Sequence, residues 1–227
     1  MPKLWRRAPF RRLRAKIVSL CFTDGSISRP ARAVVLLLVT AVVAVALVYG
    51  LSLRKSVWFW TAGSHFKGDI SSGLRWGLLA NETGLFQFYD AVEGGKVLGA
   101  ERWRRNDYTP LRLTVMTAWA RWVKRHYPGV VVWRDDYDFT APMLHTNTVA
   151  ELASSVLAFL LIHLWRVRAD DAARPVGERP RAFRGVFAGL AGALLLWFNP
   201  AIVWNGHCWP QWDVWLVPFY LSAVLLA

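Results

Sequence analysis

The chain has 227 residues, of which 55% are hydrophobic and 14 are tryptophan, and its formal net charge is +13. So many tryptophans are typical of membrane proteins, in which amphipathic rings gather at the level of the lipid headgroups. A charge of +13 alone is compatible with nucleic acid binding. The lysines and arginines, however, stand in blocks between apolar runs, which argues against nucleic acid as a partner.

The N-terminal part reads as a basic tail followed by a membrane span. Residues 1–32 hold nine Lys or Arg against one acid, and residues 33–53 carry no charge. The uncharged segment gives a helix of about 31 Å, enough to cross the hydrocarbon core. A signal peptide is the alternative, but its apolar region is shorter, about 7–15 residues, and starts nearer the N-terminus. We therefore expect a retained helix and, by the positive-inside rule, a cytoplasmic tail.

A long polar segment follows, at residues 54–147. Within it, residues 111–123 are apolar but too short to span, and they predict a helix lying in the membrane interface, with Pro110 in its first turn. Residues 129–133 are the only strand-like run.

The remaining chain alternates apolar and polar segments, so the sequence predicts an all-α polytopic membrane protein with about four transmembrane helices visible. Residues 166–184 contain six Arg and three acids and should be cytoplasmic. The last apolar run falls short of the roughly 20 residues of a span, so we expect a fragment of a longer protein. The predicted segments are a cytoplasmic tail (1–32), helix one (33–53), a large outer loop (54–147), helix two (148–165), a cytoplasmic loop (166–184), helix three (185–204), a short outer loop (205–213) and an incomplete helix four (214–227).

Two carboxylates, Asp69 and Asp107, flank a helix-like segment soon after the first span. A charge at the membrane border is costly unless it faces water or has a functional role. These carboxylates therefore suggest a site for a substrate that is held in the membrane. Spacing alone favours simpler roles. Asp69 suits a loop or the N-cap of a helix starting near Ser71, and Asp107 with Pro110 suits a turn.

Three smaller motifs are weaker. Asn81-Glu82-Thr83 matches the N-glycosylation sequon, a triplet that is frequent by chance. His207, Cys208 and Asp213 lack a second spaced ligand pair, so we expect no metal site there. Asn199-Pro200 most simply bends the third span.

Taken together, the motifs resemble a known family. They are Gly68-Asp69, Arg75-Trp76, Asp107-Tyr108-Thr109-Pro110-Leu111, and Asn199-Pro200-Ala201-Ile202 through His207 and Gln211. This set resembles the polytopic glycosyltransferases that use polyprenyl-phosphate sugars, the GT-C superfamily. It is most similar to the dolichyl-phosphate-glucose-dependent glucosyltransferases and their bacterial relatives. The likeness covers residues 33–227, and the chain departs from the family at Thr109, where the motif has proline, and in the turn after His207.

The resemblance implies roles for individual residues. Asp69 matches the family position of a catalytic base that takes the proton of the acceptor hydroxyl. Asp107 would orient the first outer loop or support the acceptor site. The remaining candidates, for contact with phosphate or acceptor, are Arg75, Tyr108, Arg112, His207 and Gln211.

The function that this resemblance implies is transfer of a sugar from a polyprenyl-phosphate donor to an acceptor at the outer membrane face. The acceptor is a glycan, a lipid or a protein. No cofactor is expected, and the sequence leaves open whether a divalent metal takes part. A bacterial cytoplasmic membrane is favoured over the endoplasmic reticulum. The alternatives are a transporter or flippase subunit without enzymatic activity, and a structural membrane protein with a basic tail that binds nucleic acid.

Overall fold

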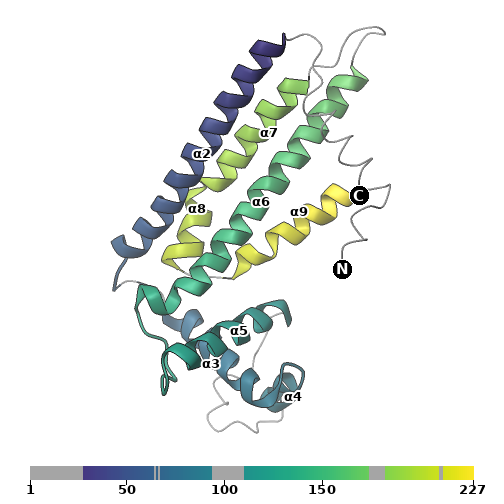
Figure 1. Cartoon of the computed structure of the whole chain (residues 1–227). Helices are drawn as coiled ribbons and strands as arrows, with labels where there is room; N and C mark the ends of the chain where they lie inside the picture. Colours follow the sequence, from purple (N-terminus) through teal and green to yellow (C-terminus); the bar gives the residue numbers. More distant parts are fainter. Residues whose placement is uncertain (1–27, 64, 66, 94–109, 174–181, 210–211) are drawn as a thin grey trace, which may run out of the picture. The chain divides into compact units, whose positions relative to one another are not determined.

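The computed structural model describes residues 28–63, 65, 67–93, 110–173, 182–209 and 212–227 (Figure 1). Every regular element in this part of the chain is a helix, which confirms the predicted all-α class. The chain divides into two compact units, which we describe separately. The membrane unit comprises Met1–Leu53, Ala150–Asn199 and Leu216–Ala227, and the loop unit comprises Arg54–Val149 and Pro200–Trp215.

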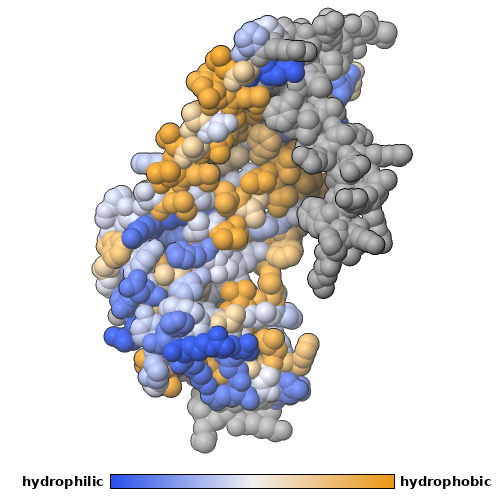
Figure 2. Space-filling model, in the orientation of Figure 1, coloured by the Kyte–Doolittle hydropathy of each residue, from blue (hydrophilic) through white to orange (hydrophobic). Residues whose placement is uncertain are grey.

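Three helices are long and apolar enough to cross a membrane, and they mark the chain as a membrane protein. These stretches are Pro30–Trp60, Tyr137–Ala172 and Gly185–Cys208. A fourth apolar helix, α9 (Val217–Leu226), has only 10 residues. Figure 2 shows hydrophobic residues over α2, and their side chains are exposed, as expected of a surface that faces lipid. The most exposed of them include Val34, Leu37, Val45 and Val48.

The helices extend beyond the spans that the sequence predicts. α2 (Arg29–Trp60) continues past residue 53, and α6 (Tyr137–Ala172) begins well before residue 148. Hydropathy marks only the part of a helix that suits lipid, whereas backbone hydrogen bonds and caps determine where the helix ends. The sequence predicts a bend at Asn199-Pro200, and there α7 (Ala182–Trp197) ends and α8 (Pro200–Val203) begins at the proline.

Small residues bring the helices of the membrane unit together. A Cβ at Gly189 would lie 2.8 Å from the Phe159 carbonyl oxygen, and one at Gly192 would lie 2.1 Å from Ile162, so α7 packs on α6 at backbone distance. Small residues at such contacts let membrane helices approach each other closely. On α2, Gly50 leaves room for Trp197, whose indole N–H donates to the Ala46 carbonyl oxygen at 3.0 Å.

The loop unit is built on α3 (Lys67–Thr83) and α5 (Pro110–His126), with the short α4 (Gln87–Glu93) between them in sequence. A Cβ at Gly77 would come within 2.3 Å of the Met116 carbonyl oxygen, so α3 and α5 also pack at backbone distance. The Asn81 amide donates to the carbonyl oxygens of Gly77 and Thr117, each at 3.0 Å. The α5 residues buried in this unit are Leu113, Met116, Thr117, Trp119, Ala120 and Val123.

Two expectations for this loop change with the structure. The apolar face of residues 111–123, which suggested an interfacial helix, is buried against protein. The strand-like run at 129–133 is irregular, and the described residues offer it no partner strand. Its anchor is Trp133, whose indole N–H donates to the Thr140 hydroxyl oxygen at 3.0 Å, while Val131 and Val132 are exposed.

The orientation in the membrane is testable by cysteine labelling. We expect a membrane-impermeant maleimide to label Glu82→Cys in intact cells, and to label Ala173→Cys only after permeabilisation, because Lys and Arg cluster around residues 166–184. Both residues are exposed. Cys21 and Cys208 are replaced by serine in the background. Labelling of Ala173→Cys without permeabilisation would show that the topology is the opposite of the predicted one.

Candidate functional site

Asp69 lies in the first turn of α3, a little inside the helix rather than at the N-cap expected from its sequence. The side chain is half-buried, and the Trp209 indole nitrogen lies 3.5 Å from its Oδ2. Backbone N–H groups at a helix N-terminus favour a carboxylate at this place. Four residues on, Gly73 admits the Trp212 ring, because a Cβ there would lie 2.4 Å from it. The start of α3 therefore faces the segment that contains Trp209 and Trp212.

This segment begins with a wide turn, η3 (Trp204–Cys208), a π-helix that follows α8 directly. Its widened geometry shows in the bond from the Trp209 amide to the Trp204 carbonyl oxygen, five residues back, at 2.9 Å. Single π-turns are frequent at functional sites. Gly206, His207 and Cys208 are buried within the turn.

The amide of Asn147, on α6, holds the turn in place. Its Nδ2 donates to the Gly206 carbonyl oxygen at 2.7 Å, and its Oδ1 accepts from the Trp215 indole N–H at 2.7 Å. Asn147 is fully buried, so both of its polar ends are satisfied away from water. One side chain thus fixes both ends of residues 206–215.

Arg112 is connected to the same segment. It lies in the first turn of α5 and forms an ion pair with Asp213, the first residue of η4 (Asp213–Trp215). The Arg112 side chain is 12% exposed and that of Asp213 is 68% exposed. Two contacts therefore connect α3 and α5 to residues 204–209 and 212–215, and we call the four residues that form them the motif cluster: Asp69, Trp209, Arg112 and Asp213.

The sequence-predicted residues are distributed unevenly. Asp69, Arg112 and His207 lie in the segments that meet at the motif cluster, but His207 is only 2% exposed. Arg75 lies on α3 and is exposed. Asp107, Tyr108 and Gln211 lie outside the described residues.

Sequence reasoning missed the pairing of a buried histidine, His65, with Asp135. Nδ1 of His65 lies 2.6 Å from Asp135 Oδ1, and Nε2 lies 3.0 Å from the Trp58 carbonyl oxygen and 3.1 Å from Thr61 Oγ1. The ring stacks on Trp58 with centroids 3.8 Å apart. Both ring nitrogens therefore lie within hydrogen-bond distance of oxygen atoms. The pair ties the end of α2 to the chain just before α6, and its partners, 70 residues apart, leave no local signal in the sequence.

The chemistry available at the motif cluster is that of a half-buried carboxylate beside an indole and an ion pair. Asp69 can accept a proton or a hydrogen bond. Among the described residues, no three His, Cys, Asp or Glu side chains gather in a way that would hold a metal.

Comparisons with known proteins identify no relative: no family model, no curated protein and no solved structure matches the chain.

The Asn147 bridge predicts a large loss of stability on its removal. Asn147→Ala leaves the Gly206 carbonyl oxygen and the Trp215 indole N–H buried without their partner, and we expect a loss of about 2–4 kcal/mol in the free energy of unfolding. The measurement is unfolding by sodium dodecyl sulfate in mixed micelles. The control is Thr146→Ala, because the Thr146 hydroxyl bonds only within α6. Equal effects of the two changes would contradict the bridge.

A double-mutant cycle measures the His65–Asp135 pair. We expect His65→Ala and Asp135→Asn to couple by about 1.5–3 kcal/mol in the free energy of unfolding, the range for a hydrogen bond to a charged group. The control cycle pairs His65→Ala with Asp138→Asn. Asp138 is exposed on the first turn of α6, so the coupling in that cycle should be near zero. Additive effects of His65→Ala and Asp135→Asn would show that the pair contributes nothing.

Proposed function

We propose that the chain belongs to a membrane glycosyltransferase that moves a sugar from a polyprenyl-phosphate donor to a hydroxyl acceptor at the outer membrane face. One observation carries the proposal. Segments that contain or adjoin the motifs resembling the GT-C pattern lie far apart in the chain and touch in the loop unit, through the contacts of Asp69 with Trp209 and of Arg112 with Asp213.

In the proposed reaction, the acceptor oxygen attacks the anomeric carbon of the donor sugar. The bond from that carbon to the phosphate oxygen breaks, and the lipid phosphate leaves with the bonding electrons. Asp69 takes the proton of the acceptor hydroxyl as the new bond forms. Its half-buried place at the N-terminus of α3 holds the carboxylate ready while leaving one side accessible.

The two arginines suit different tasks. Arg112 is largely buried and pairs with Asp213, so it is better placed to hold residues 204–215 than to reach a phosphate. Arg75 is exposed and carries a fork of donors suited to phosphate oxygens. We assign phosphate contact to Arg75 and positioning to Arg112. Asp107 keeps the supporting role that the resemblance implies.

A transporter is the second candidate, favoured by polar residues on α6 in the membrane unit. Glu151, Ser154, Ser155 and His163 are all buried on that helix. Ionisable residues within a span often mark a path for ions or protons. A transporter would move substrate without cleaving the donor, so detection of a glycosylated product separates the two functions.

Replacement of Asp69 tests the enzyme. Asp69→Asn keeps the size of the side chain and removes proton acceptance. We expect it to lower turnover about 10²–10⁴-fold, the usual contribution of a general base. The assay follows radiolabelled sugar from polyprenyl-phosphate donors in membranes that contain the product of the intact gene. Asp107→Asn should have a smaller effect on turnover.

The matched control is Asp90→Asn, an exposed carboxylate on α4 of the same unit, which should leave turnover unchanged. If Asp69→Asn kept near wild-type turnover and Asp107→Asn were inactive, Asp107 would be the catalytic base and Asp69 the supporting residue. Absence of sugar transfer from every polyprenyl-phosphate donor would favour the transporter.

A further inference from the structure

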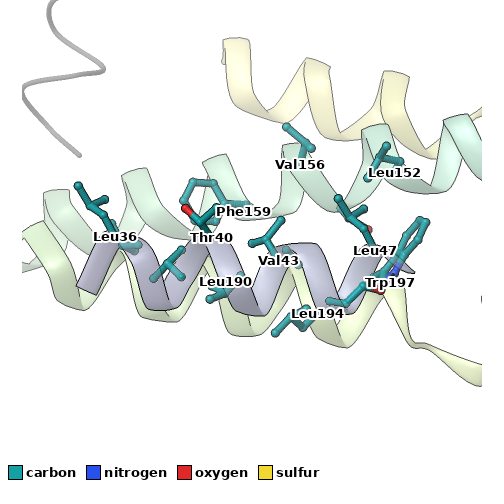
Figure 3. Close-up of a pocket in the computed structure, with 15 residues that line it drawn as sticks. Leu36, Thr40, Val43, Leu47, Leu152, Val156, Phe159, Leu190, Leu194 and Trp197 are labelled. Atoms are coloured by element: carbon teal, nitrogen blue, oxygen red, sulfur yellow. Dashed lines mark hydrogen bonds between the residues drawn. The ribbon is translucent and has the colours of Figure 1, made fainter. Parts of the chain in front are cut away.

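The membrane unit contains a cavity of about 410 Å³ between α2, α6 and α7 (Figure 3). This volume lies within the range of pockets that hold small molecules, about 300–1,000 Å³. Residues from all three helices line it: Leu36, Val39, Thr40, Val43, Ala46, Leu47, Leu152, Ser155, Val156, Phe159, Val186, Leu190, Ala193, Leu194 and Trp197.

The lining indicates the chemistry of the occupant. Thirteen of the fifteen lining residues are apolar, so a ligand gains little from polar atoms here. Of the other two, Ser155 already donates its hydroxyl to the Glu151 carbonyl oxygen at 2.9 Å. The abundant apolar molecules beside a membrane-spanning helix are lipid chains. The expected occupant is therefore a hydrocarbon chain whose polar group lies outside the cavity.

The length of the cavity matches one leaflet. From Leu36 to Leu47 the lining follows α2 for about 16 Å, at about 1.5 Å per residue. Half of a hydrocarbon core of about 30 Å is about 15 Å, the depth that one lipid chain covers. Trp197 lies at the end opposite Leu36 (Figure 3), and its bond to the Ala46 carbonyl oxygen fixes the ring there.

The Leu36 end is the basic end. Arg32 stands one turn before Leu36 on the same face of α2, and Arg166 stands two turns beyond Phe159 on the same face of α6. Both are exposed. Residues 1–32 and 166–184, which adjoin this end in sequence, hold fifteen Lys or Arg against four acids. Basic groups between transmembrane helices suit anionic headgroups.

We propose that this cavity, an apolar groove between the three helices, binds an anionic phospholipid. The lipid belongs to the leaflet on the side of residues 1–32 and 166–184. One acyl chain lies between α2, α6 and α7, and the phosphate lies near Arg32 and Arg166. This lipid is distinct from a sugar donor. The donor phosphate belongs at the other end of α2, where the chain continues into the loop unit. The inference stands whether or not the protein transfers sugars.

The test measures lipid binding to the purified 227-residue chain. The protein in detergent is titrated with phosphatidylglycerol or with phosphatidylcholine of the same acyl chains, and native mass spectrometry counts the bound lipid. We expect one site for phosphatidylglycerol, about 30-fold tighter than for phosphatidylcholine, since each of the two arginines contributes about fivefold. Arg32→Gln with Arg166→Gln should reduce the affinity for phosphatidylglycerol to that for phosphatidylcholine.

A matched pair on α2 tests the groove itself. Val43→Phe fills the cavity and should weaken phosphatidylglycerol binding at least tenfold. Val48→Phe adds the same ring at a residue that is 68% exposed and does not line the cavity, and it should bind like the wild type. Equal affinity of the wild type for both lipids, or equal binding by the two variants, would overturn the proposal.

Photocrosslinking gives a second readout that does not depend on a variant. Phosphatidylglycerol with a diazirine on its acyl chain should form adducts with residues that line the cavity, such as Val43, Leu190 and Leu194. Circular dichroism checks that each variant keeps its helices. Adducts spread evenly over the exposed face of α2, including Val45 and Val48, would show ordinary lipid contact and would also overturn the groove.

Discussion

The side-chain amide of Asn147 is the interaction on which the candidate site depends. It donates to a carbonyl group inside a π-turn and accepts from an indole nine residues later, so it fixes the two ends of one short segment. Between those ends lie Trp209, which reaches Asp69, and Asp213, which pairs with Arg112. Because Asn147 is buried on a long helix, the segment is fixed to a rigid element. Without that amide, the contacts of the motif cluster would lack their support.

A second requirement is close approach of the helix backbones. Gly73 and Gly77 stand one turn apart on α3, where one admits Trp212 and the other admits the Met116 carbonyl group. A larger side chain at either place would push α3 away from its neighbours. The position of Asp69, one turn before Gly73, therefore depends on the absence of side chains at both glycines.

Some of this arrangement could be predicted from the sequence, and the reason is physical. Hydropathy found three spans, and Asn199-Pro200 located the break between α7 and α8, because both signals are local. The face of α5 was misjudged: apolar residues at helical spacing look the same whether lipid or protein covers them. The His65–Asp135 pair and the Asn147 bridge were invisible because they join residues far apart in the chain. Asp107, Tyr108 and Gln211 stay predictions.

The hydrogen bonds of Asn81 have a consequence for the choice of expression host. Its amide nitrogen is shared between the Gly77 and Thr117 carbonyl groups, and its oxygen accepts from Arg121 at 3.2 Å. An oligosaccharyltransferase attaches its glycan to that nitrogen. The nitrogen is without its hydrogen bond to Thr117 only during translocation, before α5 has been synthesised. A glycan added in that interval would keep α3 and α5 apart for good. If the loop unit faces the lumen, as we propose, production through a eukaryotic secretory pathway would therefore yield a folded, unmodified fraction and a glycosylated fraction that cannot close its loop.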